Sequence, residues 1–419
     1  MKLIWSFIVI IDQVVLLLVG TYMILVAALG AGRIRPSKIA KEKQDWQPRF
    51  LCVTAAHNES AVIGLHVQNL MGMEYPKDLF DVVVVADNCT DDTAALAAAA
   101  GTHVWTRHNR VERGKGFALR WAFHERAALS EYDAVCVFDA DNLVDPNFLQ
   151  VMAQHLREGQ TAIQAYLDTK NPWDSWTTSS YAMAYWFMNR FWQHPRIRLG
   201  LSGALGGTGF CLDRRLLDAL PWEATSLTED LEYSVRVVLG GQRVYWTPLT
   251  RVYDEKPVSL KASFPQRTRW LRGHWTTAFR YSGALLKKSL RGNLRACWQA
   301  LDILAYLWQP LVILLTGLNI LLSAAQLIFG DRWYSHWLAH ALPLGIWAGL
   351  VALSGLLPLM AFAVEDVDWK TFVLYPLFLL FNVTWIPITL IGLWQHRETG
   401  WSHTRHTRAV AYQDMSAQK

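Results

Sequence analysis

Two acidic motifs follow apolar runs that have the composition of β-strands. Asp87 closes the run 81–86, and Asp139-Ala140-Asp141 follows the run 134–138. Carboxylates spaced one residue apart at the end of a strand can hold a hard divalent cation, Mg²⁺ or Mn²⁺, against a diphosphate. Asp-x-Asp alone is common in surface turns, so its place after an apolar strand is what favours a metal site here.

A glycine-flanked cation, Lys115 in Arg-Gly-Lys-Gly, lies between these acidic motifs. Its surroundings suit a contact with phosphate. The Walker pattern GxxxxGK[ST] is incomplete at this point, which disfavours an ATPase.

A third acidic motif, Thr228-Glu229-Asp230, precedes an apolar run over 231–239 that predicts a helix. Thr228 as the N-cap, with acids in the first turn, is one interpretation. The other is that Asp230 is a general base. Gln266-Arg267-Thr268-Arg269-Trp270 follows downstream, where a basic segment begins, and this combination favours the catalytic interpretation.

The elements around these motifs alternate between strand and helix. The runs 50–55, 81–86, 102–106 and 134–138 predict strands, and 60–71, 91–100 and 116–129 predict helices between them. This alternation is typical of a parallel α/β sheet. In such sheets ligands bind at the carboxyl ends of the strands, where the acidic motifs lie.

The composition argues against a wholly soluble enzyme. Of 419 residues, 52% are hydrophobic and 18% are charged, whereas a soluble domain carries about 25% charge. The 21 Trp residues fit aromatic belts at a membrane interface. The five Cys residues form no CxxC pair, so neither zinc nor a disulfide framework is implied. The net charge of +5 is diffuse and does not indicate nucleic acid.

Residues 1–32 are predicted to form an N-terminal transmembrane helix, since 13–32 carry no charge. The basic residues that follow should stay cytoplasmic, with the N-terminus outside. A cleaved signal peptide is the alternative, although the apolar run is longer than usual for one. Residues 45–260 then form the expected catalytic domain.

The C-terminal part divides into three regions. Residues 261–300 carry many cations interleaved with apolar side chains and no acid, which predicts interfacial helices on an anionic membrane face. Residues 301–395 hold three apolar segments, at 303–329, 338–363 and 372–394. Three spans would put the basic tail 396–419 outside, so 372–394, which contains Pro376 and Pro387, is predicted to be interfacial or re-entrant.

The order and spacing of these motifs resemble membrane-bound family 2 glycosyltransferases of the processive type, the hyaluronan, chitin, cellulose and poly-N-acetylglucosamine synthases. The resemblance covers about residues 50–300 and the flanking membrane segments. It implies a cytoplasmic GT-A domain with a mainly parallel sheet, embedded between transmembrane and interfacial helices of the plasma membrane. It also implies a UDP-sugar donor, an Mg²⁺ or Mn²⁺ cofactor and a polysaccharide or glycolipid acceptor.

The resemblance implies a role for each matching position. Nucleotide-sugar binding falls to His57, Glu59, Asp87, Lys115 and Asp139, and metal binding to Asp139 and Asp141. Catalysis falls to Asp230 as the base, with Glu229 and Thr228. The acceptor and diphosphate are contacted by Gly207, Gln266, Arg269 and Trp270, and the gating residues are Trp401 and Thr404. His57, Ala86, His403 and His406 depart from the usual pattern of the family. Trp270 as a membrane-interface anchor is the alternative to its role as an acceptor platform.

Three functions remain open at this point. The first is an inverting, metal-dependent and processive synthase that exports its polymer through its own membrane segments. Inversion follows from a single base without a second nucleophilic carboxylate. The second is a one-step glycolipid transferase that resembles ceramide glucosyltransferase. The third is a transporter or nucleotide-sugar-binding protein without catalysis, which has no use for both a metal pair and Thr-Glu-Asp.

Overall fold

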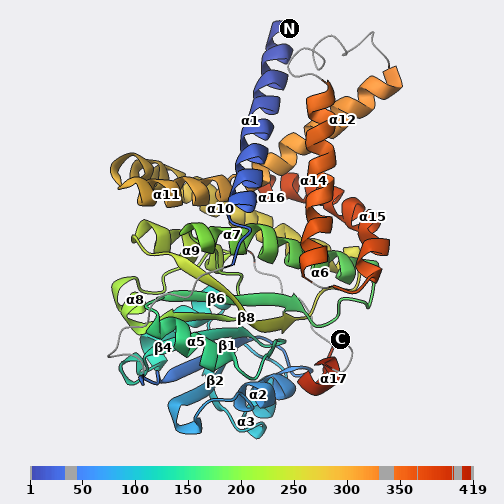
Figure 1. The fold of residues 1–419 in the computed structure, drawn as a ribbon. Helices are drawn as coiled ribbons and strands as arrows, with labels where there is room; N and C mark the ends of the chain where they lie inside the picture. Colours follow the sequence, from blue (N-terminus) through green and yellow to red (C-terminus); the bar gives the residue numbers. More distant parts are fainter. Residues whose placement is uncertain are drawn as a thin grey trace.

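The computed structural model describes residues 2–33, 45–329, 344–365, 367–398, 400 and 408–416. It has two parts, an α/β domain built on one sheet and a set of helices along one side of that domain (Figure 1). The predicted α/β fold is confirmed, and long apolar helices, here called membrane-type helices, lie towards both ends of the chain.

One eight-stranded sheet has the order β3-β2-β1-β4-β7-β6-β8-β5. Strands β1, β2, β3 and β4 are parallel to one another, β6 and β8 are parallel, and β7 and β5 run antiparallel to their neighbours. The four predicted strands are confirmed to within two residues at each end. The strands are β1 (Phe50–Ala56), β2 (Phe80–Asp87), β3 (His103–Arg107), β4 (Ala134–Asp139), β5 (Leu143–Val144), β6 (Ala162–Thr169), β7 (Phe210–Asp213) and β8 (Val244–Asp254).

Helices cover both faces of this sheet. They are α2 (Ile63–Met71), α3 (Thr93–Ala99), α4 (Lys115–Trp121), α5 (Phe148–Arg157), α6 (Trp176–Phe187), α7 (His194–Leu199), α8 (Arg214–Ala219) and α9 (Glu229–Leu239). The helix predicted over 116–129 is shorter than expected. It ends at Trp121 and continues as a π turn, which keeps Ala122 and Phe123 in the core before the chain turns towards β4.

Two hydrophobic cores result from the alternation of side chains along the strands. On one face, Phe50, Cys52 and Phe138 pack against α5, α6, α14 and α15. On the other, Val53 and Val83 pack against α4, α8 and α9. The sheet is therefore buried on both sides, and one of its cores extends into the membrane-type helices.

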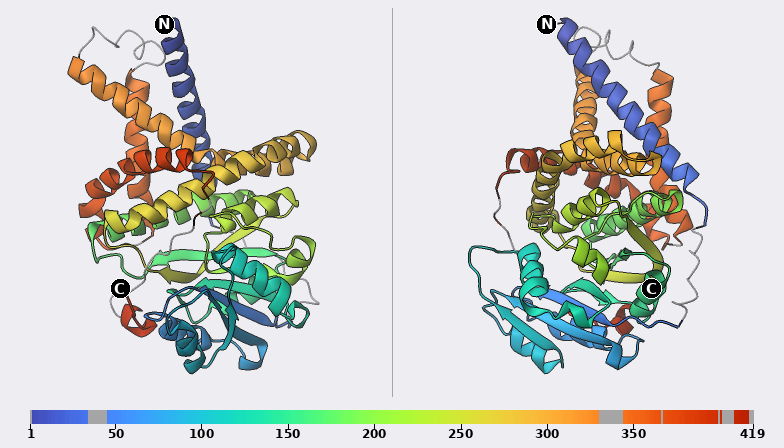
Figure 2. Two further views of the ribbon diagram at one scale, coloured as in Figure 1. Left: turned by 180° about the vertical axis from the view of Figure 1, so that it is seen from behind. Right: turned by 90° about the vertical axis from the view of Figure 1, so that its left-hand side faces the viewer.

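Apart from the short α17 (Tyr412–Ser416), whose Met415 packs with Leu143 of β5 and Tyr253 of β8, the remaining helices form the layer above the sheet. They are α1 (Lys2–Leu29), α10 (Leu260–Arg291), α11 (Leu294–Leu307), α12 (Gln309–Phe329), α14 (Leu344–Val364), α15 (Lys370–Val383) and α16 (Trp385–Trp394). Helices α10, α11 and α16 lie across the molecule, and α1, α12 and α14 extend upward from this level, with the lower end of α14 reaching α6 (Figures 1 and 2). Among the described residues, Val9–Leu29 and Lys370–Trp394 are long and apolar enough to cross a membrane.

Proline explains where two of the predicted apolar segments break. The segment predicted at 303–329 divides into α11 and α12, bent by 49° just before Pro310. The segment 372–394 divides at Thr384, because Pro387 lacks the N–H that would bond to the carbonyl of Val383. The segment Lys370–Trp394 is long and apolar enough to cross a membrane, so the interfacial or re-entrant position expected for 372–394 stays a prediction.

Candidate active site

A cavity of about 760 Å³ opens at the carboxyl ends of β1, β2 and β4 and continues towards the membrane-type helices. Its lining includes all the predicted site residues that the structure describes: His57, Glu59, Asp87, Lys115, Asp139, Asp141, Gly207, Thr228, Glu229, Asp230, Gln266, Arg269 and Trp270. The two predicted gating residues, Trp401 and Thr404, lie outside the described residues.

The end of the cavity nearest β2 is organised around Asp87. Its carboxylate is buried and accepts hydrogen bonds from Arg107 Nη1 at 2.7 Å and from Asn88 Nδ2 at 3.0 Å. His57 Nδ1 lies 2.7 Å from the backbone oxygen of Asp87. Two turns with positive φ, at Asn58 (55°) and Asn88 (53°), let the ends of β1 and β2 meet at this point.

Lys115 connects two of the predicted motifs. It begins α4 after Gly114, whose φ of 111° only glycine adopts readily. Its Nζ donates to Asp139 Oδ1 and to the backbone oxygen of Gly207, both at 2.5 Å. This cation therefore lies between the Asp-x-Asp pair and the loop beside Asp230, where a diphosphate leaving group would carry its charge.

The predicted metal pair is joined by a third acid that the sequence did not indicate. Asp141 Oδ2 accepts from the backbone N–H of Glu255 at 2.7 Å. Asp254 at the end of β8 pairs with Lys256 Nζ at 2.5 Å, and its Oδ1 has no hydrogen-bond partner in the described part of the chain. Burial raises the pKa of Asp254 to about 6; Lys256 opposes this, and the charges of Asp141 and Asp139 reinforce it.

The donor set fits a divalent cation held jointly with a substrate. Within the described ranges, no three His, Cys, Asp or Glu residues lie close enough to hold a metal by themselves. Mg²⁺ is commonly bound through one or two carboxylates plus substrate phosphates. Asp139 and Asp141 meet that requirement, with Asp254 adding negative charge nearby.

Asp230 lies at the start of α9, where its side chain reaches the cavity. Thr228 occupies the N-cap position of α9 with Glu229 and Asp230 in the first turn, but its side chain makes no cap hydrogen bond and its Oγ1 is buried without a partner among the described residues. Gly207 has a φ of 85°, and a Cβ there would lie 3.4 Å from Asp230 Oδ2. The loop thus approaches the carboxylate closely because it carries glycine.

Burial makes these two acids harder to ionise than usual. It raises the pKa of Glu229 to about 7, and the charge of Asp230 adds to that shift. It also raises the pKa of Asp230, against the opposing effects of the Leu231 N–H and the cations of Lys115 and Arg269. Burial thus raises the pKa of both carboxyl groups, while the cations of Lys115 and Arg269 favour the ionised form of each.

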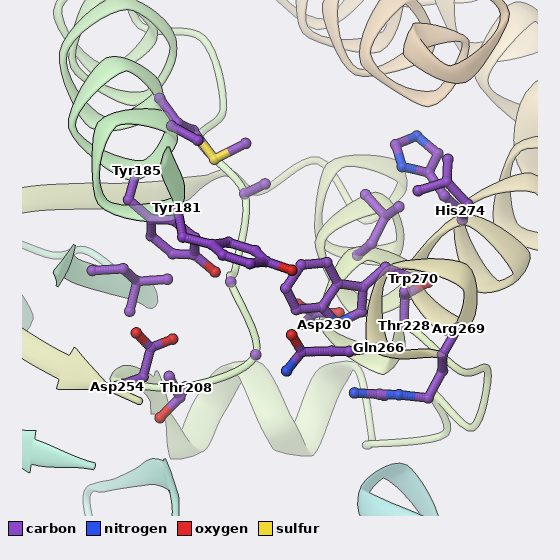
Figure 3. Close-up of a pocket in the computed structure, with 18 of the residues that line it drawn as sticks. Tyr181, Tyr185, Thr208, Thr228, Asp230, Asp254, Gln266, Arg269, Trp270 and His274 are labelled. Carbon is purple, nitrogen blue, oxygen red and sulfur yellow. The ribbon is translucent and has the colours of Figure 1, made fainter. Parts of the chain in front are cut away.

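Gln266, Arg269 and Trp270, which are predicted to contact the acceptor and the diphosphate, come from α10. Arg269 Nη1 donates to the backbone oxygen of Leu227 at 3.3 Å. Trp270 stacks on Trp385 at 6.5 Å and meets the edge of Tyr181 at 6.3 Å. Figure 3 shows Asp230, Gln266 and Trp270 together, with Tyr181 reaching towards Trp270 and Asp254 farther along the cavity. Trp270 therefore lines the cavity, in the position that its predicted role as an acceptor platform requires.

Several lining residues were missed at the sequence level because no short motif contains them. Tyr181 and Tyr185 come from α6, His274 from α10, and Asp254 and Lys256 from the end of β8. Burial lowers the pKa of His274 to about 4, so the imidazole is neutral, and its Nε2 lies 3.2 Å from the backbone oxygen of Tyr306.

The end of the cavity along α12, α15 and α16 is mostly apolar. Its lining continues along one face of α12 and onto the junction of α15 and α16: Pro310, Val312, Ile313, Thr316, Ile320, Asn382, Val383, Trp385 and Ile386. At an α-helical rise of 1.5 Å per residue, the lining from Gln309 to Ile320 extends about 16 Å along α12. The catalytic carboxylates and this apolar wall thus share one cavity.

Comparisons with known proteins agree with this geometry. A family profile described as "Glycosyltransferase like family 2" matches residues 48–273. A beta-monoglucosyldiacylglycerol synthase from Nostoc sp. is 28% identical over 330 residues, which are 73% of this chain and 69% of that protein. A poly-beta-1,6-N-acetyl-D-glucosamine synthase from Staphylococcus aureus is 24% identical over 231 residues, covering 52% of this chain and 53% of that protein.

A solved structure supports the fold over almost the whole chain. The mannosyltransferase PcManGT from Pyrobaculum calidifontis, in complex with GDP-Man and Mn²⁺, has a TM-score of 0.61 at 15% identity. The match covers 94% of this chain and 99% of that one. With the family profile spanning more than half of the sequence, the chain belongs to glycosyltransferase family 2, and it is a glycosyltransferase with a GT-A-type fold.

Proposed function

We propose that this enzyme transfers a hexose from a UDP-sugar to the hydroxyl of a membrane lipid, in a single step with inversion at the anomeric carbon. The observation that carries the proposal is the continuity of the cavity, from the carboxylates at the strand ends to an apolar wall on α12, α15 and α16. We further propose an integral membrane protein of the plasma membrane with its catalytic domain in the cytoplasm.

The chemistry of the wall favours a lipid over a growing polymer. A polysaccharide presents hydroxyls along its length and needs polar partners throughout a channel. Val312, Ile313 and Ile320 instead offer methyl groups over about three turns of α12. Each Å² of apolar surface that acyl chains bury against such side chains contributes about 25 cal/mol to binding. The Nostoc relative, named as a glucosyldiacylglycerol synthase, is consistent with this choice.

Asp230 is the proposed general base. The acceptor hydroxyl attacks the anomeric carbon, its proton passes to the Asp230 carboxylate, and the bond to the diphosphate breaks. Lys115 and Arg269 favour the ionised form of Asp230, against the effect of its burial. Gln266 and Trp270 hold the acceptor beside that carboxylate, with the buried amide oxygen of Gln266 having no partner among the described residues.

Lys115 and Arg269 receive the charge of the departing nucleoside diphosphate, and His57, Glu59 and Asp87 hold its nucleoside. Asp139 and Asp141 would hold Mg²⁺ or Mn²⁺, which supplies further positive charge to the diphosphate when bound. Such preorganised charge around a leaving group is commonly a large part of catalysis.

Trp401 and Thr404 remain the proposed gate over the nucleotide. One observation supports a tail close to the site. The backbone N–H of Arg408 donates to Glu255 Oε2 at 3.0 Å, and Glu255 is the residue whose N–H binds Asp141. The described end of the tail is therefore held beside the proposed metal pair.

A processive polysaccharide synthase is the second candidate. Trp270, Tyr181 and Trp385 make an aromatic cluster that could pack against sugar rings. The relative from Staphylococcus aureus is named as a poly-N-acetylglucosamine synthase. The two candidates share their catalytic residues and differ in the size and solubility of the product.

The test measures the radiolabelled product formed by membranes that contain the wild type, Asp230→Asn or the control Asp92→Asn. Each membrane preparation is given a panel of radiolabelled UDP- and GDP-sugars with Mg²⁺ or Mn²⁺. Asp92 is an exposed acid outside the cavity. We expect an organic-extractable product with one sugar from the wild type and the control only. A high-mass, glycosidase-sensitive product would instead establish the processive synthase. Equal transfer by Asp230→Asn would refute Asp230 as the base.

A further inference from the structure

A buried ion pair lies behind the wall of the cavity, in a part of the molecule that none of the predicted motifs touches. Arg196 on α7 is fully buried and donates from Nε and Nη2 to the two carboxylate oxygens of Asp302 on α11, each at 2.9 Å. Tyr22 on α1 donates its hydroxyl to the same carboxylate at 2.7 Å. Three helices from distant parts of the chain are therefore joined at one carboxylate.

The ion pair is one helical turn away from two aromatic rings that line the cavity. Trp192 precedes Arg196 by four residues, and Tyr306 follows Asp302 by four, so each ring shares a helix face with its charged neighbour. The Trp192 and Tyr306 rings are in contact, with centroids 4.4 Å apart. Both residues line the cavity, whereas Arg196 and Asp302 do not.

The guanidinium of Arg196 holds Trp192 directly. It lies 4.2 Å from the centroid of the indole ring, and its Nη1 donates to the Trp192 backbone oxygen at 3.0 Å. The indole N–H itself has no hydrogen-bond partner among the described residues. The position of this ring therefore depends on its contacts with Arg196 and Tyr306. Tyr306 in turn presents its backbone oxygen to His274 on α10.

We propose that Arg196, Asp302 and Tyr22 are positioning residues for the acceptor: they fix Trp192 and Tyr306 in the cavity wall and couple helix α1 to that wall. The proposal rests on the proposed function, since it assigns the membrane side of the cavity to the acceptor. Figure 1 shows the lower end of α1 reaching the layer of α7 and α11, where this coupling takes place. The nucleotide end of the cavity lies on other elements, so donor binding should not depend on the network.

The kinetics of variants separate this role from a purely structural one. In Asp302→Asn and Arg196→Lys we expect kcat/KM for the acceptor to fall by about 10- to 100-fold, the cost typical of a misplaced binding wall. The KM for the nucleotide sugar should stay within about twofold of the wild type. Tyr22→Phe, which removes only the hydroxyl contact between α1 and Asp302, should give a smaller loss of the same kind.

A double variant keeps the test decisive if single variants fold poorly. Arg196→Met with Asp302→Leu removes both charges together, an exchange that buried ion pairs often tolerate. We expect it to fold and to bind donor normally, yet to remain weak towards the acceptor because the cation over Trp192 is lost. Acceptor constants restored to the wild-type value in this double variant would overturn the proposal, as would equal changes in the donor and acceptor constants.

Failure of the proposed function has a different signature. If the wild type elongates an oligosaccharide and ignores lipids, the single-step lipid function falls. The same comparison of donor and acceptor constants, made with the oligosaccharide, then still decides whether Arg196, Asp302 and Tyr22 position the acceptor.

Discussion

Burial acts on both acids at the start of α9. It raises the pKa of Glu229 and that of Asp230. Lys115 and Arg269 favour the ionised form of Asp230. The cations proposed to receive the leaving diphosphate thus also favour the ionised form of the proposed base.

Arg269→Gln should therefore change the pH profile as well as the rate. A base works only when ionised, so activity is lost as pH falls through the pKa of Asp230. Removing the cation raises that pKa, and we expect the acid limb of kcat/KM to move to higher pH by about one unit. Arg269→Lys keeps the charge and should keep the limb in place. An acid limb that stays fixed, or moves to lower pH, in Arg269→Gln would contradict the assignment.

Gly207 offers a second test at the residue scale, with a matched control in the same chain. Gly207 and Gly101 both have positive φ, 85° and 96°, so Ala at either should cost roughly 1–2 kcal/mol of stability. Only at Gly207 would the new methyl group face Asp230, whereas nothing lies within 4 Å at Gly101. We expect thermal unfolding to shift similarly in both variants and transfer activity to fall only in Gly207→Ala. Equal activities in the two variants would show that the loop does not approach the reacting atoms.

At the scale of elements, the carboxyl ends of the strands are held together by buried polar side chains. His66 on α2 lies with Nε2 2.7 Å from Thr54 Oγ1 on β1 and Nδ1 2.8 Å from the backbone oxygen of Asn142 after β4. Burial lowers the pKa of His66 to about 4. The neutral imidazole therefore joins the helix to β1 and to the segment at the end of β4 that carries Asp139 and Asp141.

This geometry predicts a loss of stability on acidification. An unfolded His has a pKa near 6.5, so between pH 6.5 and 4 the unfolded chain binds a proton that the folded chain does not. The stabilisation is complete above that window and declines as pH falls; the loss between pH 7.5 and 5 is about 2 kcal/mol. His66→Gln should be less stable at pH 7.5 but should lack this part of the decline in thermal unfolding. The same pH dependence in both proteins would show that another group is responsible.

The strands that were predictable are those with continuous apolar runs. β1, β2 and β4 consist almost entirely of Val, Ala, Leu, Cys and Phe, and the acids follow them directly. β6 and β8 escaped prediction because they bury polar groups whose partners lie far away in sequence. Asp168 in β6 pairs with Arg251 in β8 at 2.9 Å and accepts from the Trp186 indole at 3.0 Å. A charged residue in a run argues against a buried strand until its partner is known.

The site residues divide in the same way as the strands, into those that a local pattern indicates and those that only the fold brings together. Asp87, Asp139, Asp141, Asp230 and Trp270 were predictable because each belongs to a short motif. Asp254, Tyr181 and Trp385 enter the cavity from elements separated from those motifs by long stretches of chain, and only the fold brings them there. Arg267 is a related case. It stands inside the motif but is buried against Phe381 and Trp385, where it holds the α15–α16 junction.

At the scale of the whole molecule, the sheet domain and the helical layer form one functional unit. Helices α10, α11 and α16 lie between the strand ends and the upright helices (Figure 2). Gly317 on α12 lies against Ile386 on α16, and Gly392 lies against Leu271 on α10, so closely that a Cβ at either glycine would be 2.6 Å from its neighbour. These close crossings place the apolar wall within the same cavity as Asp230.

The central claim, that the acceptor enters from the membrane along α12, is tested most directly by measuring kcat/KM for lipid acceptors of increasing acyl length. Ile313→Trp narrows the wall, and Ile328→Trp places the same bulk on an exposed position of α12 outside the cavity. We predict that kcat/KM rises with chain length in the wild type and in Ile328→Trp, and that this rise is lost in Ile313→Trp while the KM for the nucleotide sugar is unchanged. A kcat/KM independent of chain length in the wild type, or one unaffected by Ile313→Trp, would contradict a lipid acceptor in this cavity.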